Sequence, residues 1–336
     1  MNEYDLTKYE IKEFFFEDKP ALVDVSVLIL FFNRPDHVRQ VFEQVKRARP
    51  SRLFLYQDGA RKNNKNDEIN IAKCRKIVSE IDWSCTVYTY FQTENYGCDP
   101  SEYISQKWAF SISDKCIVLE DDDVPCVSFF RFCKELLDKY EDDKRIYRIS
   151  GQNILGEYNP YDADYFFTKG GSIWGWASWK RVIDEWDPDY TFLSDSRIVD
   201  GIVFSYSSAG VKPKKFINTC EKHKKSGKEY YESIFFSSRI LGSGLTIVPS
   251  KNMISNIGIS AEATHGGTNI KLFTKSVQKA FYAPTYELTG SIKHPRYVLE
   301  DKRYEVLQSK MMGWRNNIFQ KVATVIEERI RGILYR

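Results

Sequence analysis

The stretch VDVSVLILFFNRPDHVRQVFEQVKRARPSRLFLYQDG, residues 23–59, decides the fold of this chain. Its apolar and β-branched start predicts a fully buried strand, which is followed by a helix with Pro35 near its first turn and by a second strand. The pattern then repeats, with a helix over 67–81, a strand over 85–91, a helix over 100–111 and a strand over 116–120. This β-α-β-α order predicts a mostly parallel, doubly wound α/β sheet.

Polar side chains follow the carboxyl ends of three of these strands. They are Asn33 and Arg34, then Asp58, and finally the run Glu120, Asp121, Asp122 and Asp123. Open α/β sheets bind ligands outside the carboxyl ends of their strands. Carboxylates crowded there are suited to Mg²⁺ or Mn²⁺ and, through the metal, to a diphosphate. The alternative is that the acids only occupy the first turn of the helix that follows, where the helix dipole favours negative charge.

The phosphate-binding motifs of other nucleotide enzymes are missing from the sequence. It contains neither GxGxxG nor GxxxxGK[ST], which argues against a dehydrogenase and a P-loop enzyme. A phosphatase of the haloacid dehalogenase type would need DxDx[TV] on its first strand, whereas these acids end the fourth strand and precede Val124 and Pro125. A metal would therefore have to neutralise the phosphates, as in nucleotide-sugar chemistry.

The composition narrows the class further. A formal charge of +3 over 336 residues argues against a nucleic-acid binder, and 15% aromatic residues suggest stacking surfaces for sugars. Seven cysteines without metal-ligand spacing predict buried free thiols in a reducing compartment. The N-terminus does not resemble a signal peptide, and the longest apolar run, 25–32, is shorter than the roughly 20 residues that span a bilayer. We therefore expect a cytoplasmic protein, soluble or peripheral to the membrane.

Four segments of the chain resemble a known protein family. They are VLILFFNRPDHVRQVFEQV, LFLYQDGAR, NYGCDPSEYISQKWAF and VLEDDDVPCVSFFRFCKELLDKYEDDKRIYRISGQN. They resemble GT-A glycosyltransferases of the N-acetylglucosaminyltransferase I type. They are more similar still to bacterial hemolysin-like (HlpA-like) glycosyltransferases, which share the SIWGWASWKR and PSKNMISNIGISAEATHGG segments. The resemblance covers residues 25–267 and implies a GT-A fold. It also implies that Asp58 contacts the nucleobase and that Asn33 and Arg34 form the wall of the nucleotide pocket.

The same resemblance makes the acidic run a variant DxD motif. Asp122 would coordinate the metal, and Glu120 and Asp121 would support the metal and the ribose or donor sugar. Asp123 is expected to cap the following helix. GT-A enzymes often close the metal or diphosphate site with a C-terminal histidine, which here would be His265. A neutral imidazole suits Mn²⁺ better than Mg²⁺, but a lone histidine can also be merely structural.

The sugar pocket is expected around the tryptophans and acids of the second half. Trp174 and Trp176 would line it in the relatives, although packing in the core is the alternative. Inverting transfer needs a base for the acceptor hydroxyl, and Glu232 occupies the position where the relatives have the aspartate of a W-D-Y-like motif. The sequence departs from that motif with Glu for Asp and Tyr231 for Trp. Glu229 is the substitute candidate.

Two basic stretches suggest partners. The lysines between residues 211 and 228 are either a solvated face or attract an anionic acceptor, such as a lipid-diphosphate-linked glycan or the phospholipid surface around it. Residues 314–336 have apolar positions near a helical period and a basic polar side. They would form either an interfacial helix in peripheral contact with the membrane or a helix packed on the protein.

The sequence thus predicts a glycosyltransferase that moves a hexosyl or N-acetylhexosaminyl group from a nucleoside-diphosphate sugar, most simply a UDP-sugar, to a glycan or lipid-linked acceptor in surface polysaccharide synthesis. Mn²⁺ or Mg²⁺ would be its cofactor. The alternatives are a sugar nucleotidyltransferase and a non-catalytic glycan-binding protein. The expected parts are an N-terminal extension (1–24), a nucleotide-sugar-binding half (25–125), an acceptor-binding and catalytic half (126–290) and a C-terminal tail with an amphipathic helix (291–336).

Overall fold

The computed structural model describes residues 4–206, 213–259 and 270–312, together with Glu327, Arg329 and Arg331. Nine strands of this part form one sheet in the order β1-β4-β3-β2-β5-β9-β7-β10-β8. In chain order these strands are β1 Glu10–Phe14, β2 Val23–Phe31, β3 Pro50–Gln57, β4 Cys85–Phe91, β5 Lys115–Glu120, β7 Ile146–Ser150, β8 Tyr165–Thr168, β9 Trp176–Trp179 and β10 Leu245–Pro249. Strands β1, β8 and β9 oppose the common direction of the other six. The predicted mixed α/β fold with a mostly parallel sheet is therefore confirmed.

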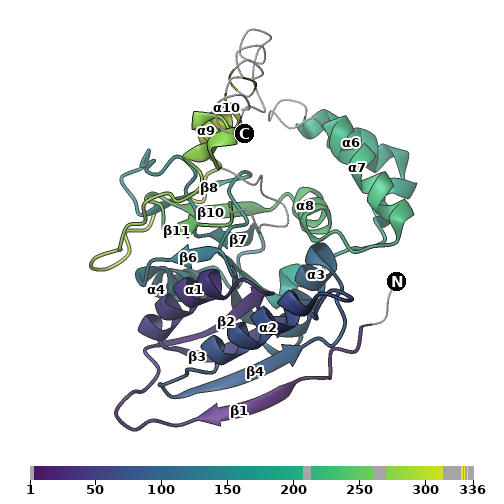
Figure 1. Ribbon diagram of the computed structural model, residues 1–336. Helices are drawn as coiled ribbons and strands as arrows, with labels where there is room; N and C mark the ends of the chain where they lie inside the picture. The colour runs from purple at the N-terminus through teal and green to yellow at the C-terminus, as the bar shows by residue number, and fades with distance from the viewer. Residues whose placement is uncertain are drawn as a thin grey trace.

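Helices cover both faces of the sheet (Figure 1). They are α1 Pro35–Ala48, α2 Lys65–Val78, α3 Cys98–Ile112, α4 Ser128–Lys139, α5 Lys180–Ile183, α6 Ser196–Tyr206, α7 Pro213–Ser226, α8 Tyr231–Leu241, α9 Lys275–Gln278 and α10 Lys302–Met311, with short 3-10 turns at Thr191–Ser194 and Ile270–Leu272. Helix α1 has Pro35 at its start, as predicted, and the Asn64 side chain caps α2.

The central position of β2 in the sheet explains why its sequence is apolar without interruption. Val27 and Ile29 pack with α1, α2 and α4 on one face of the sheet, whereas Leu28 and Leu30 pack with α3 and α8 on the other. Because side chains alternate across a strand, a central strand that is covered on both faces must be apolar at every position. The hydrophobic core therefore has two halves, and the sheet separates them.

The strand order creates a crevice between β2 and β5. From β2 the chain adds β3 and then β4 on one side, and α3 returns it across the sheet to β5 on the other side. Parallel sheets bind ligands where the strand order reverses, outside the carboxyl ends of the strands. The segments after β2 and after β5 meet at this point, so Arg34 lies close to Asp121 and Asp122.

A small second sheet holds the acidic run in place. Strand β6, Asp123–Pro125, pairs antiparallel with β11, Ile254–Asn256. This pairing corrects one prediction, because Asp123 does not cap α4. The Glu287 carboxylate does so instead, by accepting hydrogen bonds from the backbone nitrogens of Val127 at 2.9 Å and Ser128 at 2.7 Å. Asp123 is drawn away by the strand pairing and is fully buried.

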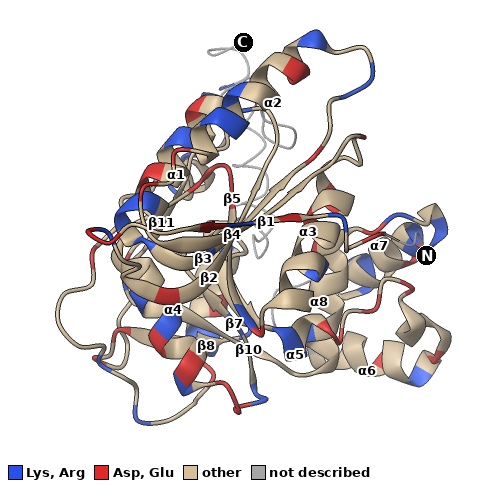
Figure 2. Cartoon of the chain, turned by 90° about the horizontal axis from the view of Figure 1, so that it is seen from below, with Lys and Arg blue, Asp and Glu red and all other residues tan. Residues whose placement is uncertain are grey.

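The peripheral segments bear on the expected partners. Figure 2 shows basic residues, in blue, along α7. The exposed lysines of α7 are Lys214, Lys215, Lys222, Lys224 and Lys225, and the nearby Lys228 is also exposed. Apart from Glu327, Arg329 and Arg331, the expected C-terminal helix over 314–336 lies outside the described residues, so membrane contact stays a prediction. In the part of the chain that the structure describes, none of the helices combines the length and apolar character needed to cross a bilayer.

Candidate active site

Two adjoining cavities open at the carboxyl ends of β2 and β5. The first has a volume of about 130 Å³ and the second a volume of about 350 Å³. The two cavities share four of their lining residues, which are Arg34, Cys98, Glu102 and Glu120. The shared lining means that a single elongated ligand can extend from one cavity into the other.

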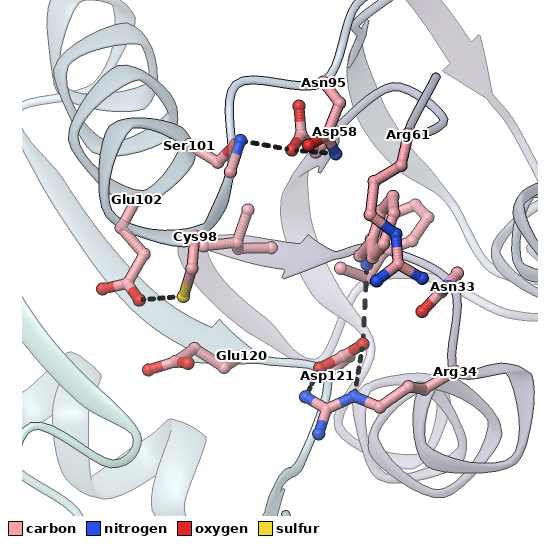
Figure 3. Close-up of a pocket in the computed structure, with 14 residues that line it drawn as sticks. Asn33, Arg34, Asp58, Arg61, Asn95, Cys98, Ser101, Glu102, Glu120 and Asp121 are labelled. Atoms are coloured by element: carbon pink, nitrogen blue, oxygen red, sulfur yellow. Dashed lines mark hydrogen bonds and ion pairs between the residues drawn. The ribbon is translucent and has the colours of Figure 1, made fainter. Parts of the chain in front are cut away.

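Asp58 lies at one end of the first cavity, where the loop before α3 forms the wall (Figure 3). Its carboxylate accepts hydrogen bonds from the backbone nitrogens of Gly59, Tyr96 and Gly97 and from the Asn95 side chain, at 2.8–3.0 Å. A carboxylate offers about four acceptor positions, and these contacts use them. Asp58 therefore shapes the cavity by holding this loop, and its contact with a nucleobase stays a prediction. Burial raises the pKa of Asp58 above its usual value.

The opposite wall carries a second polar network. Asn33 donates to Asp67 at 2.7 Å, and Arg61 makes a two-point contact with the same carboxylate, with both distances 2.7 Å. The Arg61 guanidinium also lies 5.5 Å from the centre of the Phe32 ring. Asn33 and Arg61 both line the cavity, so this network presents amide and guanidinium groups to a ligand.

Arg34 is the counter-charge of the acidic run. Its guanidinium contacts both Asp121 oxygens and lies 2.9 Å from Asp122 Oδ2. Burial alone would lower the pKa of Arg34, but the charges of Asp121 and Asp122 raise it above its usual value. For Asp122, burial outweighs the attraction of Arg34, and the net effect is a raised pKa.

Asn256 joins the two acids that follow. Its side-chain nitrogen donates to Asp122 Oδ1 at 3.1 Å and to Asp123 Oδ1 at 3.0 Å, while the other Asp123 oxygen accepts from the Gly175 nitrogen at 2.8 Å. Burial, and then the charge of Asp122, raises the pKa of Asp123 to about 8. Gly258 has a steric role here, because a Cβ atom at this position would lie 2.2 Å from Asp122 Oδ2.

The second cavity contains the candidate base. Glu232, in the first turn of α8, and Trp174 both line it, and the Trp174 ring lies 4.7 Å from that of Phe281. Trp176 is placed differently from the expectation. It is 2% exposed, lines neither cavity and packs against Phe235, because its position in β9 turns it into the core.

Glu229 is separated from these cavities. It is buried, lines neither of them, and accepts a hydrogen bond from the Tyr4 hydroxyl at 2.7 Å. Its carboxylate therefore ties the N-terminal segment to the start of α8. Of the two candidate bases, Glu232 is the one that lines the second cavity.

Glu102 is a cavity residue that the sequence did not single out. It is 8% exposed and follows Cys98 by one helical turn, and the Cys98 thiol donates to its Oε1 at 3.4 Å (Figure 3). Burial, with smaller contributions from neighbouring carboxylates, raises the pKa of Glu102 well above its usual value. Cys98 is only partly buried, unlike the other six cysteines, all of which are free as expected.

The donor set at the acids fits a hard cation only in part. No group of three or more Asp, Glu, His or Cys side chains surrounds a common point within the described residues, and His265 lies outside them. Mg²⁺ and Mn²⁺ can, however, be held by one or two carboxylates together with substrate phosphates and water. Asp122 and Asp121 provide such carboxylates, provided that a metal replaces part of their contact with Arg34.

Sequence reasoning missed five residues that line the two cavities. They are Arg61, Asn95, Cys98, Glu102 and Asn256. All of them lie within segments that carried the family resemblance. Arg61 and Asn95 each follow a strand by four residues, which was a usable signal, whereas Cys98 and Glu102 lie within α3 and gave none.

Comparisons with known proteins add little. Neither a scan against protein-family models nor a search of curated proteins gave a match. One of the matching solved structures is 4-diphosphocytidyl-2C-methyl-D-erythritol synthase from Anaerococcus prevotii. It is 10% identical, with a TM-score of 0.29 over 48% of this chain and 73% of that chain. A similarity this low supports no inference about activity.

Proposed function

We propose that the protein is a GT-A glycosyltransferase that uses a nucleoside-diphosphate sugar, most simply a UDP-sugar. The observation that supports this most is the pair of adjoining cavities, with Arg34 and the acids where they meet and Glu232 on the far wall. The nucleoside would occupy the first cavity, the diphosphate would lie near Arg34, and the sugar would extend toward the second cavity. A glycan or lipid-linked acceptor would enter beside Trp174.

The reaction is a displacement at the anomeric carbon. Glu232 would remove the proton of the acceptor hydroxyl while that oxygen attacks the anomeric carbon. The bond between this carbon and the diphosphate oxygen would break, and its electron pair would leave with the diphosphate. Attack from the face opposite the leaving group inverts the configuration. Arg34 would stabilise negative charge on the leaving diphosphate.

A divalent metal would be held by Asp122, with Asp121 beside it. When bound, it would supply Lewis-acid stabilisation of the leaving diphosphate. Asn256 would orient Asp122 through its hydrogen bond to Oδ1, so the carboxylate keeps one direction whether or not Arg34 remains in contact with it. His265, which lies outside the described residues, stays a prediction as a further metal ligand.

A ligand screen tests the proposal. We expect one family among UDP-, GDP- and dTDP-sugars to raise the thermal midpoint of the full-length protein in MnCl₂, because a ligand that binds only the folded state stabilises it. Asp122→Asn should remove the metal-dependent part of this increase. The proposal fails if no nucleotide sugar raises the thermal midpoint in the presence of Mn²⁺ or Mg²⁺.

Turnover assays separate the alternatives. Release of free nucleoside diphosphate from the donor supports the transferase. Release of pyrophosphate from a nucleoside triphosphate and a sugar 1-phosphate would instead indicate a nucleotidyltransferase. Metal-independent glycan binding without turnover would indicate a binding protein.

A further inference from the structure

The excess positive charge of the chain is concentrated on α7 and the two residues after it. Residues 213–228 contain six lysines and one acid, Glu221, so with His223 neutral their net charge is +5. The whole chain has a net charge of +3, which leaves −2 for all the other residues together. One helix therefore carries a strong positive charge on a molecule that is otherwise slightly acidic.

The six lysines face solvent. All of them are exposed, and within the described residues none of them forms an ion pair with a carboxylate. The Lys224 side chain donates to the Tyr190 carbonyl oxygen at 3.4 Å, which leaves its positive charge without an opposite charge. The surface of α7 can therefore attract a large anionic partner from solution.

Helix α7 is packed beside the helix that carries the candidate base. The Phe216 ring lies 5.8 Å from the Phe236 ring of α8. His223 Nδ1 lies 2.7 Å from the hydroxyl oxygen of Ser233, which directly follows Glu232 in the first turn of α8. The lysine surface is therefore held on the same side of the molecule as the second cavity.

Helix α6 adds exposed apolar side chains to this surface. It packs against α7 at the edge of the molecule (Figure 1), and Phe204 is 85% exposed and Ile198 43% exposed. Lysines combined with exposed apolar side chains are typical of proteins that lie on a lipid interface, where the lysines contact anionic headgroups and the apolar groups enter the acyl boundary. Nucleic-acid phosphates would also attract the lysines, but they offer no apolar environment to Ile198 and Phe204.

We propose that α6 and α7 form a docking surface for the anionic phospholipid surface of a membrane. The lysines contact the headgroups, and Phe204 enters the interface. This inference goes beyond the proposed function and does not depend on it, because it requires neither a donor nor a metal. A membrane held there would lie beside α8 and would keep a lipid-linked acceptor near the second cavity.

Vesicle flotation of the full-length protein tests the proposal. We expect binding to vesicles of phosphatidylcholine and phosphatidylglycerol in about equal parts, and no binding to phosphatidylcholine alone. Raising NaCl from about 0.1 M to about 0.5 M should weaken the binding, because salt screens exposed charges. A variant with four changes in α7 should bind about tenfold or more weakly, since each lysine near an anionic surface adds to the attraction. The changes are Lys214→Gln, Lys215→Gln, Lys222→Gln and Lys225→Gln.

Matched controls remove the same groups elsewhere. Lys12→Gln, Lys73→Gln, Lys76→Gln and Lys144→Gln together remove four exposed lysines outside α7 and should leave vesicle binding unchanged. Phe204→Ser should weaken by about threefold or more the binding that remains in high salt, because the apolar contribution is not screened. Phe15→Ser, at an equally exposed position directly after the edge strand β1, should not weaken it.

Three results would overturn the docking surface. They are equal binding of the wild type to both kinds of vesicle, binding of the α7 variant that equals that of the wild type, and equal losses in the two lysine variants. Tighter binding to a DNA duplex than to anionic vesicles, lost in the α7 variant, would assign the lysines to a nucleic acid and would overturn it as well. Thermal midpoints equal to that of the wild type show that the variants are folded. Because no nucleotide sugar is present, these results are independent of the ligand screen that tests the proposed function.

Discussion

Arg34 Nη2 lies 2.9 Å from Asp122 Oδ2 and also contacts Asp121, so one guanidinium neutralises two buried carboxylates. These three groups come from the ends of β2 and β5, which are about ninety residues apart in the chain but adjacent in the sheet. A metal held by Asp121 and Asp122 would have to share this contact.

Arg34→Ala should cost about 3–5 kcal/mol of the free energy of unfolding, because it leaves two buried carboxylates without their partner. The same variant should gain more thermal stability from MnCl₂ than the wild type, since the cation replaces the lost charge. The control is Arg39→Ala in α1, whose exposed pair with Glu80 should contribute less than about 1 kcal/mol. Urea unfolding with and without MnCl₂ measures both effects, and equal losses in the two variants would contradict the role of Arg34.

Asn256 should be most sensitive to an acidic replacement. Asn256→Ala removes the amide that both Asp122 and Asp123 share, at a cost of about 1–3 kcal/mol. Asn256→Asp should cost more near neutral pH, because it adds a third carboxylate to two that are already buried. Thermal unfolding of both variants tests this order. If Asn256→Asp is more stable than Asn256→Ala, the hydrogen bonds of Asn256 to Asp122 and Asp123 do not stabilise the fold.

Gly258→Ala should disturb the position of Asp122 without disturbing the fold at large. The added Cβ atom would lie 2.2 Å from Asp122 Oδ2, which requires the carboxylate to move. We expect the metal-dependent increase in thermal midpoint with a nucleotide sugar to be lost. Gly201→Ala is the matched control, because a Cβ there meets nothing within 4 Å. Equal responses of the two variants to metal and donor would show that Asp122 does not hold the metal.

Glu232 and Glu229 should differ in what their loss affects. Glu232→Gln should lower kcat by about 10²–10⁴ while leaving the KM for the donor nearly unchanged, as expected for a general base. Glu229→Gln should instead cost about 1 kcal/mol of stability, because it weakens the contact with the Tyr4 hydroxyl. Steady-state kinetics together with urea unfolding separates the two roles, and a large loss of kcat in the Glu229 variant alone would reverse them.

The stability of the wild type should fall relative to Glu102→Gln as the pH rises. The pKa of Glu102 is raised in the folded state, so the folded protein retains a proton that the unfolded chain has already released above its ordinary pKa near 4.5. The free energy of unfolding of the wild type therefore decreases with pH above this value, by about 1.4 kcal/mol for each tenfold difference in proton affinity. The glutamine side chain of the variant does not titrate, so its free energy of unfolding lacks this decrease.

Urea unfolding at about pH 5 and about pH 8 measures the change in the difference between wild type and variant. The difference should move in favour of Glu102→Gln at the higher pH. Glu10→Gln, in the exposed strand β1, should show no such trend. A difference that is constant with pH would mean that Glu102 titrates normally.

The sheet was predictable because its signals are local. The uninterrupted apolar run of β2 required cover on both faces, and Pro35 marked the start of the first helix. Antiparallel β1 at the edge was not predicted, because its sequence, EIKEF, is polar and exposed at nearly every position. An edge strand of this kind carries almost no hydrophobic pattern from which to recognise it.

The candidate site was predictable only where it follows strand ends. Arg34, Asp58 and the acids Glu120 to Asp122 meet because parallel strands bring their carboxyl ends to one edge. Glu102 was missed because it lies within a helix, where an acid is usually solvated. Trp176 and Asp123 were misjudged for the opposite reason, since both lie near functional neighbours but are turned into the core by strand pairing.

The sequence by itself determined the alternation of strands and helices, and with it the edge at which the polar residues gather. These properties follow from local hydrophobic periodicity and from the geometry of parallel strands. Only the tertiary structure decided which carboxylates are paired, which face a cavity and which are buried among hydrophobic side chains. Arg34 neutralises Asp121 and Asp122, Asn256 holds Asp122 from more than a hundred residues away, and Glu102 and Glu120 line the same two cavities. Such contacts depend on burial and distance in space, which residue order does not specify.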